Sequence, residues 1–163
     1  MSIRKLILGC QWVEVIALAV WVGGLVTIIA AVIPAVFGSP VTIEAGGRLL
    51  TKTFHGYDRL VLVSAGALML SMLTREVVAK DLISRPEWAV AGIMVMVAVG
   101  LTFYLNPEVV RLQELAFAER ETEAKKAAYE AFFHYHWIAR ALYLINLGLG
   151  ATLLCMKVWK WVR

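Results

Sequence analysis

The histidines are the residues of this chain best suited to binding a metal or a haem. His134 and His136 occur in the stretch EAFFHYHWIAR at residues 130–140, and His55 is the third histidine. Side chains two positions apart on a regular helix point about 200° away from each other, so His134 and His136 cannot ligate one ion together. A haem b site would need one histidine from each of two facing helices, and the sequence offers His55 with His136 for that role. A zinc site would need three or four ligands, which these two histidines and Asp58 barely supply.

The same histidines also suit a role without a cofactor, bonded to loop carbonyls or carboxylates where a helix enters a membrane. The residues that start the second and fourth apolar runs are expected to meet, because both helices would enter from the same side of the membrane. We therefore predict an outer polar cluster around His55 and His136. Its other members are expected to be Asp58, Arg59, Tyr135 and Arg140.

Glu14 and Arg75 are charged residues inside apolar runs, where a charge is costly and usually has a partner. Counted from the same membrane face, the two residues lie at similar depths in the first and second runs. We therefore predict an ion pair between Glu14 and Arg75. Two interpretations stay open: the pair fixes the register of two helices, or it forms a site for a proton or a substrate.

The composition indicates that the chain carrying these residues is a membrane protein. The chain has 163 residues, of which 61% are hydrophobic and 17% are charged, and its mean hydropathy is +0.75. A soluble domain carries about 25% charged residues, so the surplus apolar surface must face lipid. Since a helical span needs ~20 apolar residues, we predict an all-α, integral membrane four-helix bundle in one domain over residues 1–163. Its four spans are expected at 6–37, 57–78, 88–105 and 137–158.

The connections between these spans differ. Residues 108–135 are long, charged and rich in helix formers, so we expect either a helical hairpin that projects from the bilayer or an amphipathic helix on its surface. Residues 38–54 are expected to form a turn followed by a short interfacial helix. Asn106-Pro107 is expected to end or kink the third helix.

Orientation and redox environment follow from the ends of the spans. Lysine and arginine residues divide evenly between the two sides, but the positive-inside rule depends most on short segments, which here are the termini and the second loop. We therefore predict an integral protein of a prokaryotic cytoplasmic membrane with both termini in the cytoplasm. Cys10 and Cys155 would lie near that reducing face and are expected to be free thiols.

Small residues repeat every four positions along the first run, at Ala19, Gly23, Thr27 and Ala31. Such a stripe lets helix backbones approach closely in lipid. We expect the stripe to pack within the bundle, and dimerisation is the alternative.

The sequence contains no hydrolase, metalloprotease, P-loop or dinucleotide-binding motif, so we predict no catalytic residues. The net charge of +4 does not indicate nucleic acid as a partner, because the basic residues lie at the ends of apolar runs, where they contact lipid headgroups.

Four stretches of the chain occur in an order that resembles a known family. They are ALAVWVGGLVTIIAAVIPAVFG, AGGRLLTKTFHGYDRL, NPEVVRLQEL and FFHYHWIARALYLINLG. In this order they resemble the transmembrane protein 205-like family, small four-helix membrane proteins of unknown function. The family pattern has an aromatic-x-Tyr-His motif, matched here at residues 133–136, and typically an asparagine about two turns later, where this chain has Tyr143 and then Asn146.

The resemblance implies a four-helix membrane domain and points to His136 as the family-like histidine. The family is also remotely similar to copper-resistance D-like and haem-binding protoporphyrinogen oxidase-like membrane domains. This similarity keeps the binding of haem or copper as an alternative.

These observations favour a small membrane scaffold or an accessory component of a membrane assembly, without evident catalysis. Its expected partners are the lipid bilayer, other membrane proteins or a second copy of the chain. One alternative is a membrane redox protein that binds haem b or a metal through His55 and His136. Another is a small-molecule permease or channel subunit whose path is lined by Glu14 and Arg75.

Overall fold

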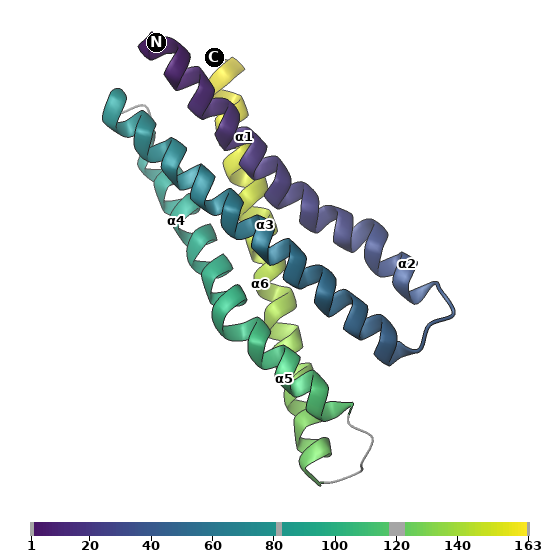
Figure 1. Ribbon diagram of the computed structural model, residues 1–163. Coiled ribbons are helices and arrows are strands. Elements are labelled where there is room, and N and C mark those ends of the chain that lie inside the picture. The colour runs from purple at the N-terminus through teal and green to yellow at the C-terminus, as the bar shows by residue number, and fades with distance from the viewer. Residues whose placement is uncertain (1, 81–82, 118–122, 163) are drawn as a thin grey trace.

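The computed structural model describes residues 2–80, 83–117 and 123–162, and it is a bundle of helices. The first span consists of α1 (Ile3–Thr27), the π-helix η1 (Ile28–Val32) and α2 (Ile33–Phe37), and the second is α3 (Ile43–Val78). The third consists of α4 (Arg85–Gly100), the π-helix η2 (Leu101–Leu105) and α5 (Asn106–Ala116), and the fourth is α6 (Glu123–Val162). All four are long and apolar enough to cross a membrane, which confirms the predicted all-α, four-pass architecture. The two chain ends lie at the same end of the bundle (Figure 1).

The starts of α3 and α4 are set by polar residues that satisfy free backbone groups. Thr42 precedes α3, and its hydroxyl accepts a hydrogen bond of 3.2 Å from the backbone N–H of Ala45. Ser84 precedes α4, where Pro86 occupies the first turn and therefore loses no helical hydrogen bond. The Ser84 hydroxyl donates to the carboxylate of Glu87 at 2.8 Å, so this carboxylate is held at the helix N-terminus.

Each π-helix lies directly before a turn that contains proline. Pro34 follows η1 and Pro107 follows η2. Proline has no N–H to donate and its ring clashes with the carbonyl four residues earlier. A wider π turn accommodates this defect without breaking the helix. The third span therefore continues through Asn106-Pro107 to Ala116 and does not end there.

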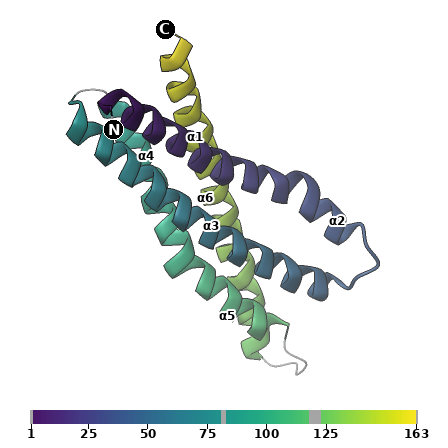
Figure 2. The same cartoon turned by 45° about the horizontal axis from the view of Figure 1, so that its top comes forward.

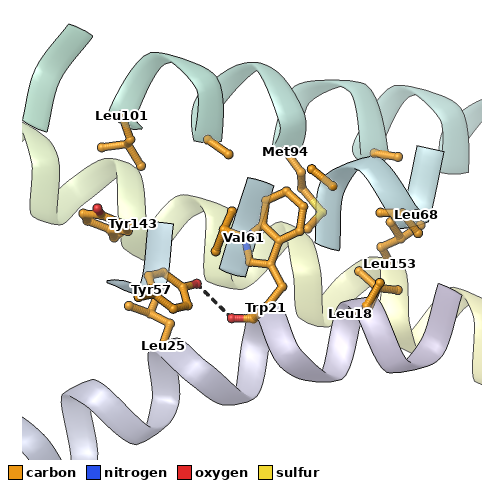
Figure 3. Close-up of a cluster of buried hydrophobic side chains, with 14 of the residues drawn as sticks. Leu18, Trp21, Leu25, Tyr57, Val61, Leu68, Met94, Leu101, Tyr143 and Leu153 are labelled. Carbon is orange, nitrogen blue, oxygen red and sulfur yellow. Dashed lines mark hydrogen bonds between the residues drawn. The ribbon is translucent and has the colours of Figure 1, made fainter. Parts of the chain in front are cut away.

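The core lies where α1, α3, α4 and α6 pack together. α1 contacts α3 and α6, and α4 contacts α6 and α3. Leu18, Leu68 and Leu153 are fully buried beside Trp21 and Met94 (Figure 3). The hydroxyl of Tyr57 donates to the backbone carbonyl of Trp21 at 2.8 Å, drawn as a dashed line in Figure 3.

The bundle opens at the end away from the termini. There the hairpin of α2 and α3 diverges from the hairpin of α5 and α6, as both Figures 1 and 2 show. A second apolar cluster holds the α5–α6 hairpin together, with Leu112 and Ala116 packed on Ala128 and Phe132. The two hairpins are bridged by Thr51, whose hydroxyl donates to the amide oxygen of Gln113 at 2.6 Å.

Two details differ from the expectations, and the structure decides between two alternatives for a third. The second helix begins at Ile43, so residues 43–54 continue the span and do not form a separate interfacial helix. Of the two alternatives for the connection after the third span, the structure has the helical hairpin and not the surface helix. The small-residue stripe of α1 is exposed at all four positions, so the prediction that this stripe packs within the bundle was wrong. The close approach is made instead by Gly24, where an added Cβ would lie 3.0 Å from the Tyr57 ring.

Candidate functional site

The first polar cluster, which we call the terminal ionic network, joins all four spans near the end that carries the termini. It consists of Glu14 from α1, Arg75 from α3, Glu87 from α4, and Lys157 with Lys160 from α6. Glu14 and Glu87 are 0% and 1% exposed, so neither carboxylate has water as an alternative partner. A charge buried in this way is tolerated only where opposite charges and hydrogen bonds surround it.

The charges of this network alternate in sign. One nitrogen of Arg75 donates to both oxygens of Glu14, at 2.8 and 3.0 Å. Lys157 donates to the same carboxylate at 2.5 Å and lies 3.6 Å from Glu87. Lys160 then bonds Glu87 from the exposed side. Three cations therefore enclose two carboxylates, an arrangement that fixes four helices in one register.

The second group, which we call the central polar cluster, is neutral apart from one carboxylate. Asp58 on α3 is 3% exposed. The Nδ2 of Asn106 donates to Asp58 at 2.6 Å and to the hydroxyl oxygen of Tyr143 at 2.7 Å. The Tyr143 hydroxyl in turn donates to the other oxygen of Asp58 at 2.8 Å. Three helical segments thus meet in a closed ring of hydrogen bonds.

The apolar core separates the two clusters. In Figure 3, Tyr143 and Tyr57 lie at the Leu101 end of the core, whereas Leu68 and Leu153 lie at the other end. Asn146, one turn beyond Tyr143 on α6, is also buried and donates to the backbone carbonyl of Met94 at 3.4 Å. The polar groups therefore occupy two levels along the bundle with closely packed hydrocarbon between them.

The sequence-predicted pair of Glu14 and Arg75 is brought together, whereas the expected outer polar cluster is spread over several faces. Asp58 points into the bundle, but Arg59 is exposed. Tyr135 and Arg140 are also exposed, and the guanidinium of Arg140 lies 4.7 Å from the centre of the Trp137 ring.

The histidines occupy different environments. His55 and His134 are exposed, and His136 is half-buried with its ring stacked on Phe132 at 5.6 Å between centroids. Ring contacts join His136 to Phe132 on its own helix, and no hydrogen bond or ring contact joins it to His55. Within residues 2–80, 83–117 and 123–162, no group of three or more histidine, cysteine, aspartate or glutamate side chains is placed to hold a metal.

A wide pocket of about 600 Å³ lies at the open end of the bundle, between α3 and the α5–α6 hairpin. Its lining is mostly charged or aromatic and consists of Glu44, Arg48, Glu114, Ala116, Phe117, Lys125 and Tyr129. Neither His55 nor His136 lines this pocket. Its charged walls are suited to a polar partner in water and not to lipid chains.

Sequence reasoning missed most members of both clusters. Lys157 and Lys160 were interpreted as contacts to headgroups, although Lys157 is 4% exposed. Glu87 was assigned to a loop, yet it follows a serine by three residues, the spacing of a capping box. Tyr143 and Asn146 were noticed only as a departure from a family pattern. Their separation of three residues places both on one helix face, a signal that could have indicated a buried polar stripe.

The comparisons with known proteins agree with a membrane domain whose activity is not established. No curated protein and no solved structure gives a significant match to the chain. One family does match, a domain of unknown function, DUF4149, over residues 16–118. The matched segment runs from the middle of α1 to the end of α5, so it contains Arg75, Glu87, Asp58 and Asn106. The chain is an integral membrane protein that belongs to the DUF4149 family.

Proposed function

We propose that this protein is a scaffold or accessory component of a membrane assembly and that it carries out no catalysis. The observation that carries the proposal is the terminal ionic network. Every span contributes at least one charged side chain to this network, and each of these side chains forms an ion pair with another member. Ionisable groups that move protons or substrates through a membrane need access to water or to a path. Glu14 and Glu87 have neither, since both are enclosed by cations and packed helices. The ion pairs of this network thus hold the four spans together and keep the bundle rigid.

A rigid bundle serves an assembly when it also presents a surface that lipid does not cover. The charged pocket at the open end supplies such a surface, because its arginine, lysine and glutamate side chains favour polar contacts. The proposed partner is a membrane protein whose loop or terminal segment carries complementary charges and enters between the two hairpins.

Site-specific photo-crosslinking in native membranes tests this proposal. A photoreactive benzoylphenylalanine replaces either Tyr129, which lines the pocket, or Leu70, an apolar residue that is 68% exposed on α3. We expect protein adducts of one discrete mass from the position of Tyr129 and mainly lipid adducts from the position of Leu70. Equal labelling at both positions, or no protein adduct at the pocket, would contradict a partner at this site.

The competing redox function has a direct test. An absorption spectrum of the gently purified protein, oxidised and reduced, is expected to show no Soret band. A Soret band that disappears in both His55→Ala and His136→Ala would overturn the scaffold proposal in favour of a haem protein.

We further propose that the protein resides in a prokaryotic cytoplasmic membrane with both termini in the cytoplasm. We also propose that it is related to the transmembrane protein 205-like family and, more remotely, to copper-resistance D-like and haem-binding protoporphyrinogen oxidase-like membrane domains. Short terminal segments that carry Arg4 and Lys5 support this orientation. In a chain with Cys10→Ala and Cys155→Ala, we expect Ser39→Cys to react with a membrane-impermeant maleimide added to intact cells. A cysteine at Ser2 should react only after lysis, and the opposite labelling pattern would show the reverse orientation.

A further inference from the structure

Asp58 is a buried carboxylate that lies apart from the terminal ionic network. Its oxygens accept hydrogen bonds from Asn106 and Tyr143, both of which are neutral. Asp58 forms no salt bridge with a lysine or arginine in the part of the chain that the structure describes. His55, three residues earlier on α3, interacts with it electrostatically, but that side chain is exposed. A carboxylate inside a membrane protein is costly unless a positive charge accompanies it.

A small space lies beside this carboxylate. Its volume is about 10 Å³, which is room for one particle of the size of a water molecule. The wall combines hydrocarbon with polar groups and consists of Trp21, Leu25, Tyr57, Asp58, Val61, Ala98, Leu101, Tyr143 and Asn146. Three of these residues, Tyr57, Tyr143 and Leu101, lie at one end of the apolar core in Figure 3.

Asn146 supplies an independent sign that something occupies this space. Its side chain is 3% exposed, and its Nδ2 donates to the Met94 carbonyl, which fixes the orientation of the amide. The Oδ1 of Asn146 is buried and has no hydrogen-bond partner among the described residues. A buried acceptor without a donor is rare in folded proteins and usually indicates a bound water or ion.

The other polar groups of the wall also have unused oxygen lone pairs. Ionised Asp58 can accept about four hydrogen bonds and uses two of these positions for Asn106 and Tyr143. Tyr57 also lines the site, and because its hydroxyl donates its proton to the Trp21 carbonyl, its oxygen keeps lone pairs that can accept. The site thus combines one negative charge with several neutral oxygen ligands and no buried cationic side chain.

We propose that this cavity binds one dehydrated monovalent cation, Na⁺, through the Asp58 carboxylate, Asn146 Oδ1 and the hydroxyl oxygens of Tyr57 and Tyr143. A single carboxylate neutralises a single positive charge. Calcium takes six to eight oxygen ligands and magnesium usually keeps several waters, for which the cavity has no room. The inference is independent of the scaffold role, because it concerns a different cluster at a different level of the bundle.

Binding is measured on the full-length protein in lipid nanodiscs, with choline chloride replacing NaCl at constant ionic strength. We expect ²²Na⁺ to bind saturably at about one ion per chain and the melting temperature to rise with Na⁺, because a ligand that binds only the folded state stabilises it. Potassium at the same concentration should give a smaller rise. A wild-type chain that binds no ²²Na⁺ would overturn the proposal and leave a water in the cavity, and an equal response to K⁺ would overturn the assignment to sodium.

Three variants locate the site. Asp58→Asn removes the charge and should abolish binding, and Asn146→Leu keeps the size of the side chain and should weaken binding at least tenfold. Glu108→Gln changes a partly exposed carboxylate that pairs with Arg111, and it should bind as the wild type does. If Asp58→Asn does not fold, Asn146→Leu decides alone, since its own fold can be checked by circular dichroism. Unchanged binding in either site variant would place the ion elsewhere and refute the proposal.

Discussion

Removal of Glu14 should destabilise the bundle strongly, whereas removal of Glu14 and Arg75 together should cost less than the sum. Glu14 accepts two hydrogen bonds from Arg75 and one from Lys157, and its side chain is completely buried. Glu14→Gln leaves two buried cations facing a neutral amide, and breaking a buried pair in this way costs about 3–5 kcal/mol. Arg75→Met leaves Glu14 paired with Lys157, so it should cost less, about 1.5–3 kcal/mol for the lost hydrogen bonds to a charged group. In the double variant the same two charges are removed together, so we expect a coupling energy of about 1–3 kcal/mol.

The free energy of unfolding is measured in mixed micelles of dodecyl maltoside with increasing dodecyl sulfate, followed by tryptophan fluorescence. Trp21 is 2% exposed, so its emission should shift when the core opens. The exposed pair of Glu44 and Arg48, 2.7 Å apart on α3, is the matched control. Its double-mutant cycle should give at most about 0.5 kcal/mol, as is usual for an exposed i, i+4 pair. The reasoning fails if Glu14→Gln costs less than about 1 kcal/mol, or if its effect and that of Arg75→Met are strictly additive.

Two further changes test the packing of the helices in the same unfolding assay. Gly150→Ala should destabilise by about 1–3 kcal/mol because the new Cβ would lie 2.8 Å from a methyl of Val22, whereas Gly148→Ala, with open space around it, should be neutral or slightly stabilising. Equal effects of the two glycine substitutions would show that α1 and α6 are not in close contact there. Thr51→Val should cost about 1 kcal/mol by breaking the bond to Gln113, and Thr53→Val, whose hydroxyl bonds only its own helix at Leu49, should cost less. A larger loss from Thr53→Val would argue against a bridge between the two hairpins.

The number of membrane spans could be predicted from the sequence, but the lengths of their helices could not. Apolar runs mark the part of a helix that lies in lipid, and all four runs lie within the observed helices. α3 extends beyond its run to Ile43, although residues 43–54 include two glycines, because Thr42 caps the helix there. α6 extends back to Glu123 because residues 123–131 are mostly alanine, glutamate and lysine, which favour a helix. A hydropathy pattern contains no signal for a helix that continues outside the membrane, so the interfacial helix expected at residues 38–54 was an error of this kind.

The candidate sites could be predicted only in part. Glu14 and Arg75 were paired because two consecutive antiparallel helices place residues of equal depth side by side. The buried position of Lys157 could not be predicted in this way. A lysine near the end of a span commonly reaches the interface, and its sequence context looks the same when it forms a buried ion pair. The exposed stripe on α1 shows the same limit from the opposite direction. Small residues permit close packing, but which face of a helix is packed depends on the whole bundle.

The position of Asn106 shows why the central polar cluster could not be predicted from the α-helical periodicity of the sequence. On a regular α-helix, residues five positions apart point about 140° away from each other. Leu101 is buried in the core, yet Asn106, five residues later, also faces the bundle and bonds Asp58 and Tyr143. The π-helix η2 explains this, because its wider turn brings residues five apart onto nearly the same face. Ile28 and Ile33 repeat the arrangement across η1, where both pack on the core. The two prolines that follow these turns thus set the direction in which the next residues point, and the hydrogen-bonded ring around Asp58 depends on a local change of helical period.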